Sequence, residues 1–318
     1  MNIDEVKKAS LNLEKVIRKT RLIKSNIVDN CSLYLKPENL QITGSFKVRG
    51  AFNKILNLTD EEKKKGVIAC SAGNHAQGVA LAAKIMNIKA VILMPKSAPK
   101  VKIESTRALG AEVILVDGVY DDAYEKALEI QKESGYTFIH PFNDEDVIKG
   151  QGTIALEILD ELKDTDVIVC AVGGGGLISG ISFVAKQINP NIKVYGVQSN
   201  GAPGMYASLA SGYVHKLKTV HTFADGIAVK EVGNITLDYV NKYVDDVFTV
   251  KEETILEAIK LMMNKEKIIS EGAGATPLAA VLENKIPNLN KNTKVVCVIS
   301  GGNIDIDTLS RIVLNGLD

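Results

Sequence analysis

Hydrophobic residues in the middle of the chain form short β-branched runs that alternate with longer segments of helical spacing. The runs lie at 66–70, 89–94, 111–116 and 136–140. Between them, alanine, valine, leucine and isoleucine recur at intervals of three and four residues. Strands that alternate with helices of this length are typical of a parallel sheet with helices on both faces. The pattern therefore predicts one open α/β unit here.

A second series of the same kind starts with the helical pattern at 143–162. Apolar runs follow at 166–172, 193–198 and 294–300, and a glycine tract comes directly after the first of them. Ligands of open α/β sheets usually bind beyond the carboxyl ends of the strands. The sequence therefore predicts a second α/β unit and an active site in the cleft between the two.

The predicted fold class is α/β, with two open parallel-sheet domains. We assign residues 1–49 together with 143–318 to the larger, cofactor-binding domain, and residues 50–142 to the smaller one. No repeat or low-complexity linker marks the boundary.

Composition narrows the classes of partner. The 318 residues include 38 Lys+Arg and 38 Asp+Glu, so no charge excess favours nucleic acid or an anionic membrane. The first twenty residues lack the apolar core of a signal peptide, and no apolar run reaches membrane-spanning length. The four cysteines are far apart and form no C-x-x-C pair, which is typical of reduced, buried thiols. We predict a cytoplasmic protein.

Lys47 stands between Phe46 and Val48 where a helical pattern begins. Thr43 and Ser45 just before it are good N-cap residues. The lysine could simply point into water, as most lysines do. Alternatively an apolar pocket could hold it, where loss of hydration lowers the pKa and makes the amine a nucleophile. This stretch alone leaves both interpretations open.

The tract "VGGGGLISG", residues 172–180, follows an apolar run and opens a helical pattern. Consecutive glycines let the backbone approach a ligand, and their N–H groups with the helix N-terminus attract an anion. No Gly-Lys-Ser/Thr follows, which excludes a P-loop, and Ile178 and Gln198 fit a dinucleotide site poorly. A flexible glycine turn is the structural alternative. We predict a site for one compact phosphate.

The stretch "CSAGNHAQG", residues 70–78, repeats this order of strand, turn and helix in the first unit. Ser71, Asn74 and the free N–H groups of the helix could hold a second small anion, such as a carboxylate. His75 is as consistent with a structural role as with a ligand contact. A phosphate site, a carboxylate site and a lysine beside Phe46 together match what pyridoxal phosphate and an amino-acid substrate require.

With these residues in view, the chain resembles the fold type II pyridoxal-phosphate enzymes, whose fold is that of the tryptophan synthase β subunit. Within them it is most similar to the threonine/serine dehydratases and serine racemase. The motifs are "GSFKVRGA", "SAGNHAQG", "GQGTIALEI", "VGGGGLISG", "FADGIAV" and "SGGNID", in the family's order, over roughly residues 17–305.

The resemblance implies a role for each motif residue. Lys47 would be the Schiff-base lysine and the base at the substrate's α-carbon, with Phe46 against the cofactor ring, Asn74 at the ring's 3'-oxygen and Ser300 at the pyridine nitrogen. The phosphate would be held by Gly173, Gly174, Gly175, Gly176 and Leu177. The substrate would be held by Ser71, Asn74, His75 and Asp225. Asp225 could equally cap a turn before Gly226.

The resemblance implies pyridoxal-phosphate-dependent β-elimination of water from L-threonine, and also L-serine, giving isoleucine-related 2-oxobutanoate, or pyruvate, and ammonia. A neutral hydroxyl at Ser300, instead of an acid, suits elimination because less carbanion charge accumulates on the ring. Only fifteen residues follow Asn303, so we expect the short degradative threonine ammonia-lyase of amino-acid catabolism, without a regulatory domain.

Rival functions are a serine-preferring dehydratase or a serine racemase and, from another class, a non-catalytic nucleotide or amino-acid sensor. Racemases of this family have a serine where Ala72 stands, and a carboxylate cation site where this chain reads "QSNGAPG". We therefore expect a dehydratase with no metal site. The resemblance also implies a homodimer or homotetramer, and an adenine-nucleotide effector near Thr43, Gln77 and Asn303.

Overall fold

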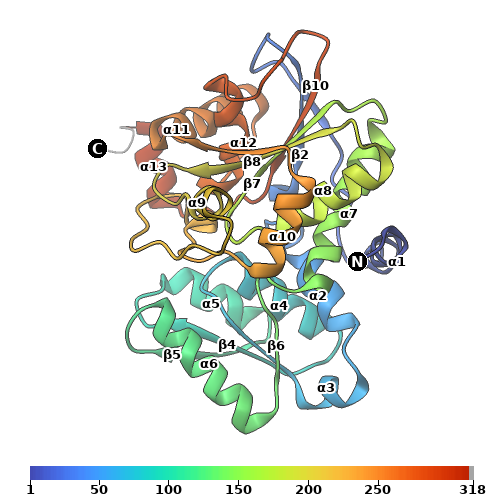
Figure 1. Ribbon diagram of the computed structural model, residues 1–318. Helices are drawn as coiled ribbons and strands as arrows, with labels where there is room; N and C mark the ends of the chain where they lie inside the picture. The colour runs from blue at the N-terminus through green and yellow to red at the C-terminus, as the bar shows by residue number, and fades with distance from the viewer. Residues whose placement is uncertain (315–318) are drawn as a thin grey trace.

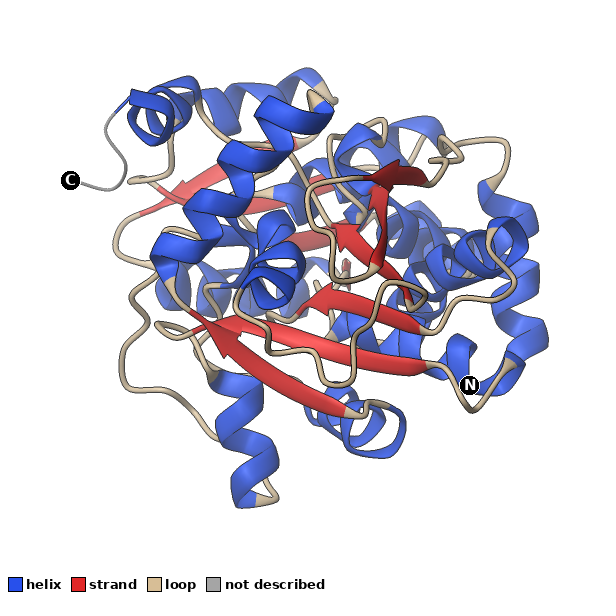
Figure 2. Cartoon of the chain, turned by 90° about the horizontal axis from the view of Figure 1, so that it is seen from above, coloured by secondary structure: helices blue, strands red, loops and turns tan. Residues whose placement is uncertain are grey.

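The structure is a computed structural model that describes residues 1–314. Two sheets with flanking helices lie one above the other in Figure 1, and Figure 2 shows helices on both sides of the strands. The predicted α/β fold class is confirmed. The last four residues of the predicted larger domain, 315–318, lie outside the described residues.

The larger sheet has six strands in the order β1-β2-β10-β7-β8-β9. The strands are β1 Ile23–Ser25, β2 Ser32–Pro37, β7 Val167–Ala171, β8 Lys193–Ser199, β9 Asp246–Val250 and β10 Lys294–Ile299. All neighbours pair in parallel except β1, which is antiparallel to β2. The antiparallel edge follows from the short connection, because residues 26–31 join β1 directly to β2 without a crossover helix.

The smaller sheet has four strands in the order β5-β4-β3-β6, all parallel. The strands are β3 Val67–Cys70, β4 Ala90–Pro95, β5 Glu112–Val116 and β6 Thr137–Phe138. The central strands β3 and β4 are buried almost throughout, which explains why they read as continuous apolar runs. The helices beside this sheet are α2 Lys47–Leu56, α3 Asp60–Lys65, α4 Asn74–Ile85, α5 Lys100–Ala108 and α6 Tyr120–Ser134.

The larger sheet has its own set of helices. They are α1 Ile3–Leu13, α7 Glu145–Glu161, α8 Gly176–Ile188, α9 Gly204–Ser211, α10 Asn234–Tyr243, α11 Glu252–Leu261, α12 Gly272–Leu282 and α13 Ile306–Leu314. Short helical turns occur at η1 Glu38–Leu40, η2 Asp225–Ile227 and η3 Met262–Glu266. No helix among residues 1–314 is long and apolar enough to cross a membrane.

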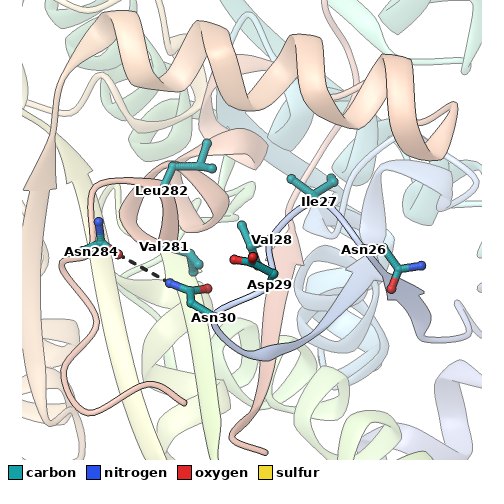
Figure 3. A pocket seen from close by; sticks show the side chains of 8 residues that line it. All are labelled: Asn26, Ile27, Val28, Asp29, Asn30, Val281, Leu282 and Asn284. Carbon is teal, nitrogen blue, oxygen red and sulfur yellow. Dashed lines mark hydrogen bonds between the residues drawn. The ribbon is translucent and has the colours of Figure 1, made fainter. Parts of the chain in front are cut away.

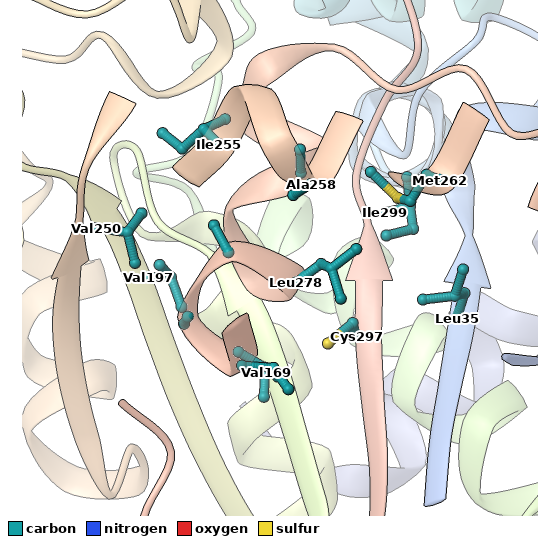
Figure 4. Close-up of a cluster of buried hydrophobic side chains, with 14 of the residues drawn as sticks. Leu35, Val169, Val197, Val250, Ile255, Ala258, Met262, Leu278, Cys297 and Ile299 are labelled. Carbon is teal, nitrogen blue, oxygen red and sulfur yellow. The ribbon is translucent and has the colours of Figure 1, made fainter. Parts of the chain in front are cut away.

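Two apolar cores cover the two faces of the larger sheet. Val169 and Cys297 point to the face that α11 and α12 cover, together with Leu278 (Figure 4). The alternate strand residues, such as Ile168 and Val296, pack with α7 and α8 on the other face. This alternation is the period of two that strands impose on their side chains.

A buried ionic cluster anchors α2, the helix that begins with Lys47. Arg49 Nε lies 2.7 Å from a Glu38 carboxylate oxygen, and its Nη1 lies 2.7 Å from Oε1 of Glu157 on α7. Lys36 Nζ pairs with the same Glu157 at 2.5 Å. Removing one member would leave an uncompensated buried charge, so this cluster fixes α2 against β2 and α7.

α2 and α7 also approach closely through glycines. A Cβ on Gly150 would lie 2.5 Å from the carbonyl oxygen of Arg49, and a Cβ on Gly50 would lie 2.2 Å from the Gln151 side chain. Only glycine permits this approach, because a real Cβ atom would overlap its neighbour. The start of α2 is thus held rigidly beside the larger sheet.

Candidate active site

Lys47 is the first residue of α2, the helix drawn where the two halves of the molecule meet in Figure 1. Its Nζ donates a hydrogen bond of 2.9 Å to the carbonyl oxygen of Pro141 and lies 5.3 Å from the centre of the Phe46 ring. Burial lowers the pKa of Lys47 to about 8, and the charge of Glu271 partly opposes this shift. Of the two interpretations of this lysine, the structure agrees with the desolvated amine, on a side chain that is half-buried.

The entry into α2 differs from the prediction. Phe46 occupies the N-cap position, and no side chain caps the helix, so the prediction that Thr43 or Ser45 would do so is wrong. Instead the Phe46 N–H donates to the carbonyl oxygen of Ser300 at 3.1 Å, and Ser45 forms a β-bridge with Gly301. Backbone pairing with the segment after β10 therefore replaces the cap and brings Ser300 next to the start of α2.

The turn after β6 contains Pro141, whose carbonyl oxygen accepts the hydrogen bond from Lys47. Nδ1 of His140 accepts hydrogen bonds from the N–H groups of Phe142, at 3.2 Å, and Asn143, at 2.8 Å. Burial, helped by the charge of Lys47, lowers the pKa of His140 to about 4. The neutral ring therefore holds the turn that presents the Pro141 carbonyl to Lys47.

The predicted phosphate loop runs from β7 into α8, which begins at Gly176. Gly175 has φ of +99°, a conformation that strongly favours glycine, and no side chain caps the helix. A Cβ on Gly174 would lie 2.3 Å from Cδ1 of Phe142, so that ring packs directly on the loop. Thr236 Oγ1 donates to the Gly174 carbonyl oxygen at 2.6 Å. The carbonyl is thereby occupied, and the N–H groups at the helix start remain suited to an anion.

Asn74 begins α4 behind Gly73, and no side chain caps this helix either. Its Nδ2 donates to Oε1 of Glu271 at 2.8 Å, and its Oδ1 accepts from Nδ2 of Asn303 at 2.7 Å. Burial raises the pKa of Glu271 to about 7, while the hydrogen bond from Asn74 opposes the shift. The sequence reading missed Glu271 entirely; the only signal is an acid directly before the small-residue run "GAGA".

The predicted substrate residues differ in what their side chains contact. Ser71 Oγ accepts from the Gly73 N–H at 3.1 Å. His75 is buried, and its Nε2 donates to the Ile139 carbonyl oxygen at 2.8 Å. Burial, and after it the charge of Lys47, lowers the pKa of His75 to about 3, so the ring is neutral.

Asp225 lies in η2, and its carboxylate, 78% exposed, pairs with Nζ of Lys102 at 3.2 Å. Lys102 belongs to α5, beside the smaller sheet, so this ion pair connects the two halves of the molecule. Lys230 and Asp121 form a second such pair at 3.6 Å. The structure thus gives Asp225 a protein partner, and its role toward substrate stays a prediction.

The residues present fit pyridoxal phosphate. Lys47 offers an amine with a lowered pKa, and the loop at 173–176 offers N–H groups to a phosphate. Among the described residues, Ser45 Oγ and His75 Nδ1 are buried without a hydrogen-bond partner. Ser45 is two residues from Lys47, and His75 is next to Asn74, so polar atoms in need of partners border the site.

One open hollow lies elsewhere. It is formed by residues 26–30 and the end of α12, where Asn30 Nδ2 donates to Asn284 Oδ1 at 3.4 Å (Figure 3). None of its lining residues is a predicted site residue. Among residues 1–314 no group of three His, Cys, Asp or Glu side chains could hold a metal ion.

Known proteins are similar to this chain in both sequence and fold. The family model "Pyridoxal-phosphate dependent enzyme" matches residues 13–301. The L-threonine ammonia-lyase of Thermotoga maritima is 51% identical over 320 residues, covering 100% of this chain and 79% of that protein. The catabolic L-threonine dehydratase TdcB of Escherichia coli K12 is 46% identical, with 98% and 95% covered. Maize serine racemase superposes with a TM-score of 0.93 at 36% identity, with 98% and 96% covered.

Proposed function

This chain belongs to the pyridoxal-phosphate dependent enzyme family, and on that basis we propose that it is an L-threonine ammonia-lyase. It removes water from L-threonine, and also from L-serine, to give 2-oxobutanoate or pyruvate with ammonia. The observation that carries the proposal is the half-buried Lys47 amine, with its pKa lowered to about 8, together with a glycine loop whose helix has no side-chain cap. Identities of 51% and 46% to an L-threonine ammonia-lyase and a catabolic threonine dehydratase support the choice of reaction.

We assign the cofactor contacts as follows. Lys47 carries the cofactor, Phe46 packs on the ring, Asn74 donates to the 3'-oxygen and Ser300 faces the pyridine nitrogen. The phosphate is held by Gly173, Gly174, Gly175, Gly176 and Leu177. Pyridoxal phosphate supplies an aldehyde that takes up an amine and a ring that withdraws electrons from the substrate's α-carbon.

The residues around Lys47 prepare its amine for proton transfer. Desolvation lowers the pKa of Lys47, so a larger fraction of the amine is neutral near neutral pH. A neutral Nζ can take the proton from the substrate's α-carbon. The Pro141 carbonyl, 2.9 Å away, accepts a hydrogen bond from Nζ and so orients the amine when it is not attached to the cofactor.

The start of α4 is our candidate for the substrate carboxylate. Gly73 gives this twelve-residue helix no side-chain cap, so its first N–H groups can bind an anion. Ser71 and Asn74 add side-chain contacts. Because the His75 ring is turned to Ile139, we assign its backbone N–H to the substrate. Asp225, in η2, is our remaining candidate for a substrate contact.

Borohydride reduction of the holoenzyme tests the cofactor assignment. Peptide mapping should place the pyridoxyl adduct on Lys47, and an adduct on another lysine would contradict the site. Steady-state rates on L-threonine, L-serine and D-serine test the reaction. We expect 2-oxobutanoate from L-threonine and pyruvate from L-serine; a protein that binds cofactor but turns over neither would refute the proposed activity.

Serine racemase is the second candidate, favoured by the TM-score of 0.93 to the maize enzyme. Ala72 argues against it, because inversion at the α-carbon needs a proton donor on the face opposite Lys47, and a methyl group offers none. We expect little D-serine from the unaltered enzyme. Ala72→Ser should raise racemisation relative to elimination, whereas D-serine formed as fast as pyruvate by the unaltered enzyme would reverse the choice.

We further propose a cytoplasmic homo-oligomer with domains at 1–49 with 143–318 and at 50–142. Exposed Leu40, Ile42 and Ile269 support an apolar subunit interface. Four buried free thiols support a reducing compartment. The mass measured by sedimentation should exceed the monomer mass of 34.3 kDa.

An adenine nucleotide is a candidate effector near Thr43, Gln77 and Asn303. Asn303 Nδ2 donates to the Thr43 carbonyl oxygen at 2.8 Å, so two of these residues are in contact. Equilibrium dialysis with AMP tests this proposal, and no binding at millimolar nucleotide would refute it.

A further inference from the structure

Glu271 stands directly before α12, and its carboxylate fills space that two glycines leave open. A Cβ on Gly301 would lie 2.5 Å from Oε1 of Glu271, and a Cβ on Gly226 would lie 3.2 Å from the same atom. The carboxylate thus lies between the segment after β10 and the η2 turn. Its hydrogen-bond donor from the other half of the molecule is Asn74.

Two side-chain amides, Asn303 and Asn74, form a directed chain of hydrogen bonds that ends at this carboxylate. Nδ2 of Asn303 donates to the carbonyl oxygen of Thr43 at 2.8 Å and to Oδ1 of Asn74 at 2.7 Å. Nδ2 of Asn74 then donates to Oε1 of Glu271 at 2.8 Å. A backbone carbonyl can only accept, so the Thr43 end sets the direction of every hydrogen bond along the chain.

This chain fixes which way the Asn74 amide faces. If the amide were flipped, its oxygen would face the Glu271 carboxylate and its NH₂ would face the NH₂ of Asn303. The contact between the two NH₂ groups would be repulsive, and so would the contact with Glu271 while that carboxyl group is ionised. In the observed orientation one hydrogen on Nδ2 is bound by Glu271. The hydrogen bonds found within residues 1–314 leave the second one available.

We propose that Glu271 is a positioning residue for the cofactor. By accepting one hydrogen of Asn74 Nδ2, it holds the amide so that the second hydrogen is offered to the 3'-oxygen of bound pyridoxal phosphate. The inference rests on the proposed function in one respect, the assignment of Asn74 to that oxygen. A carboxyl oxygen can accept this hydrogen bond whether or not the group is ionised, so the role depends on the reach of the side chain and not on its charge.

The test compares two conservative variants in the holoenzyme without substrate. Glu271→Gln keeps an acceptor oxygen at the same reach but removes the charge, whereas Glu271→Asp keeps the charge but draws the acceptor away from Asn74. If Glu271 acts by orienting the amide, the Gln variant should keep the visible absorption band and the cofactor Kd within about threefold of wild type. The Asp variant should shift the band and raise Kd roughly tenfold.

The same measurements in the Asn74→Ala background test whether Glu271 affects the cofactor through the Asn74 amide. Glu271→Asp should change neither readout there, because the amide on which it acts is gone. Glu257→Asp, an exposed acid on α11, is the matched control and should match wild type.

Two results would overturn the inference. One is the reverse order, with Asp like wild type and Gln impaired, which would indicate a purely electrostatic role. The other is an effect of equal size with and without Asn74. Because no substrate is used, failure to turn over threonine would refute the proposed activity and leave this test intact.

Discussion

Replacing Gly174 by alanine probes the contact between the glycine loop and the turn that supports Lys47. The new Cβ would lie 2.3 Å from Cδ1 and 2.4 Å from Cε1 of Phe142. The ring has little freedom to move away, since the Phe142 N–H is bonded to His140 and the two rings pack edge to face with centroids 4.6 Å apart. The loop must therefore shift.

Overpacking of this kind typically costs about 1–3 kcal/mol. If the loop must return to its native path to bind the phosphate, the cost appears in cofactor binding, and Kd should rise by about 5- to 150-fold. Titration of the apoprotein with pyridoxal phosphate, followed by the visible absorption of the bound cofactor, measures this change. Urea unfolding of the apoprotein reports any share of the cost already present without cofactor.

The double variant Gly174→Ala/Phe142→Ala provides the control. Removing the ring relieves the overlap, so the double variant should bind the cofactor more tightly than Gly174→Ala and about as well as Phe142→Ala. The argument from loop geometry would be refuted if the double variant bound the cofactor no more tightly than Gly174→Ala. It would also be refuted if Gly174→Ala bound the cofactor as tightly as wild type.

Three further predictions concern stability. His75 and His140 have folded-state pKa values of about 3 and about 4, below the usual 6.5, so below pH 6.5 the unfolded chain binds more protons at these sites, and each costs up to about 1.4 kcal/mol of stability per pH unit. Glu271, with its pKa raised to about 7, acts in the opposite sense over this range and offsets one histidine. Urea melts should therefore show a net fall of up to about 1.4 kcal/mol per pH unit below pH 6.5; a flat profile down to pH 5 would contradict this. Lys102→Met should lower the unfolding free energy by less than about 1 kcal/mol, because Asp225 is largely exposed, and a larger loss in urea melts would be inconsistent with a weak pair. Leu278→Ala should lower it by about 2–5 kcal/mol, because that side chain is fully buried under α11 (Figure 4), with a loss below 1 kcal/mol counting against the packing described.

Local pattern predicted all four strands of the smaller sheet, and strands β7, β8 and β10 of the larger one. Strands such as β7 and β10 are apolar on both faces, so their own residues identify them. β1, β2 and β9 went unpredicted. β1 has three residues, and β2 includes Lys36, whose ion-pair partner Glu157 is more than a hundred residues away. That partner, and the place of β2 next to β10, depend on tertiary pairing that no local window contains.

The candidate site divides in the same way. Lys47, Asn74 and the glycine loop lie in short motifs whose chemistry is visible in the sequence. Glu271 and the turn after His140 matter through what they touch across the fold, so only the structure brings them to the site. The missing side-chain cap of α2 also depends on contacts across the fold. Local propensity favours Thr43 or Ser45 as the cap, but the Phe46 N–H is hydrogen-bonded to the segment after β10 instead.

The strand order has a consequence for how the chain folds during synthesis. The smaller sheet draws its strands from residues 67–138, so it can assemble while the ribosome is still making the rest. The larger sheet cannot, because β10, at residues 294–299, lies between β2 and β7 and is synthesised after every other strand of the described residues. Until then β2 and β7 expose unpaired edges, and these nascent chains are prone to aggregate. A ribosome stalled before residue 294 would therefore carry a complete smaller sheet and an incomplete larger one. The unpaired strand edges of the larger sheet would then be a binding site for chaperones.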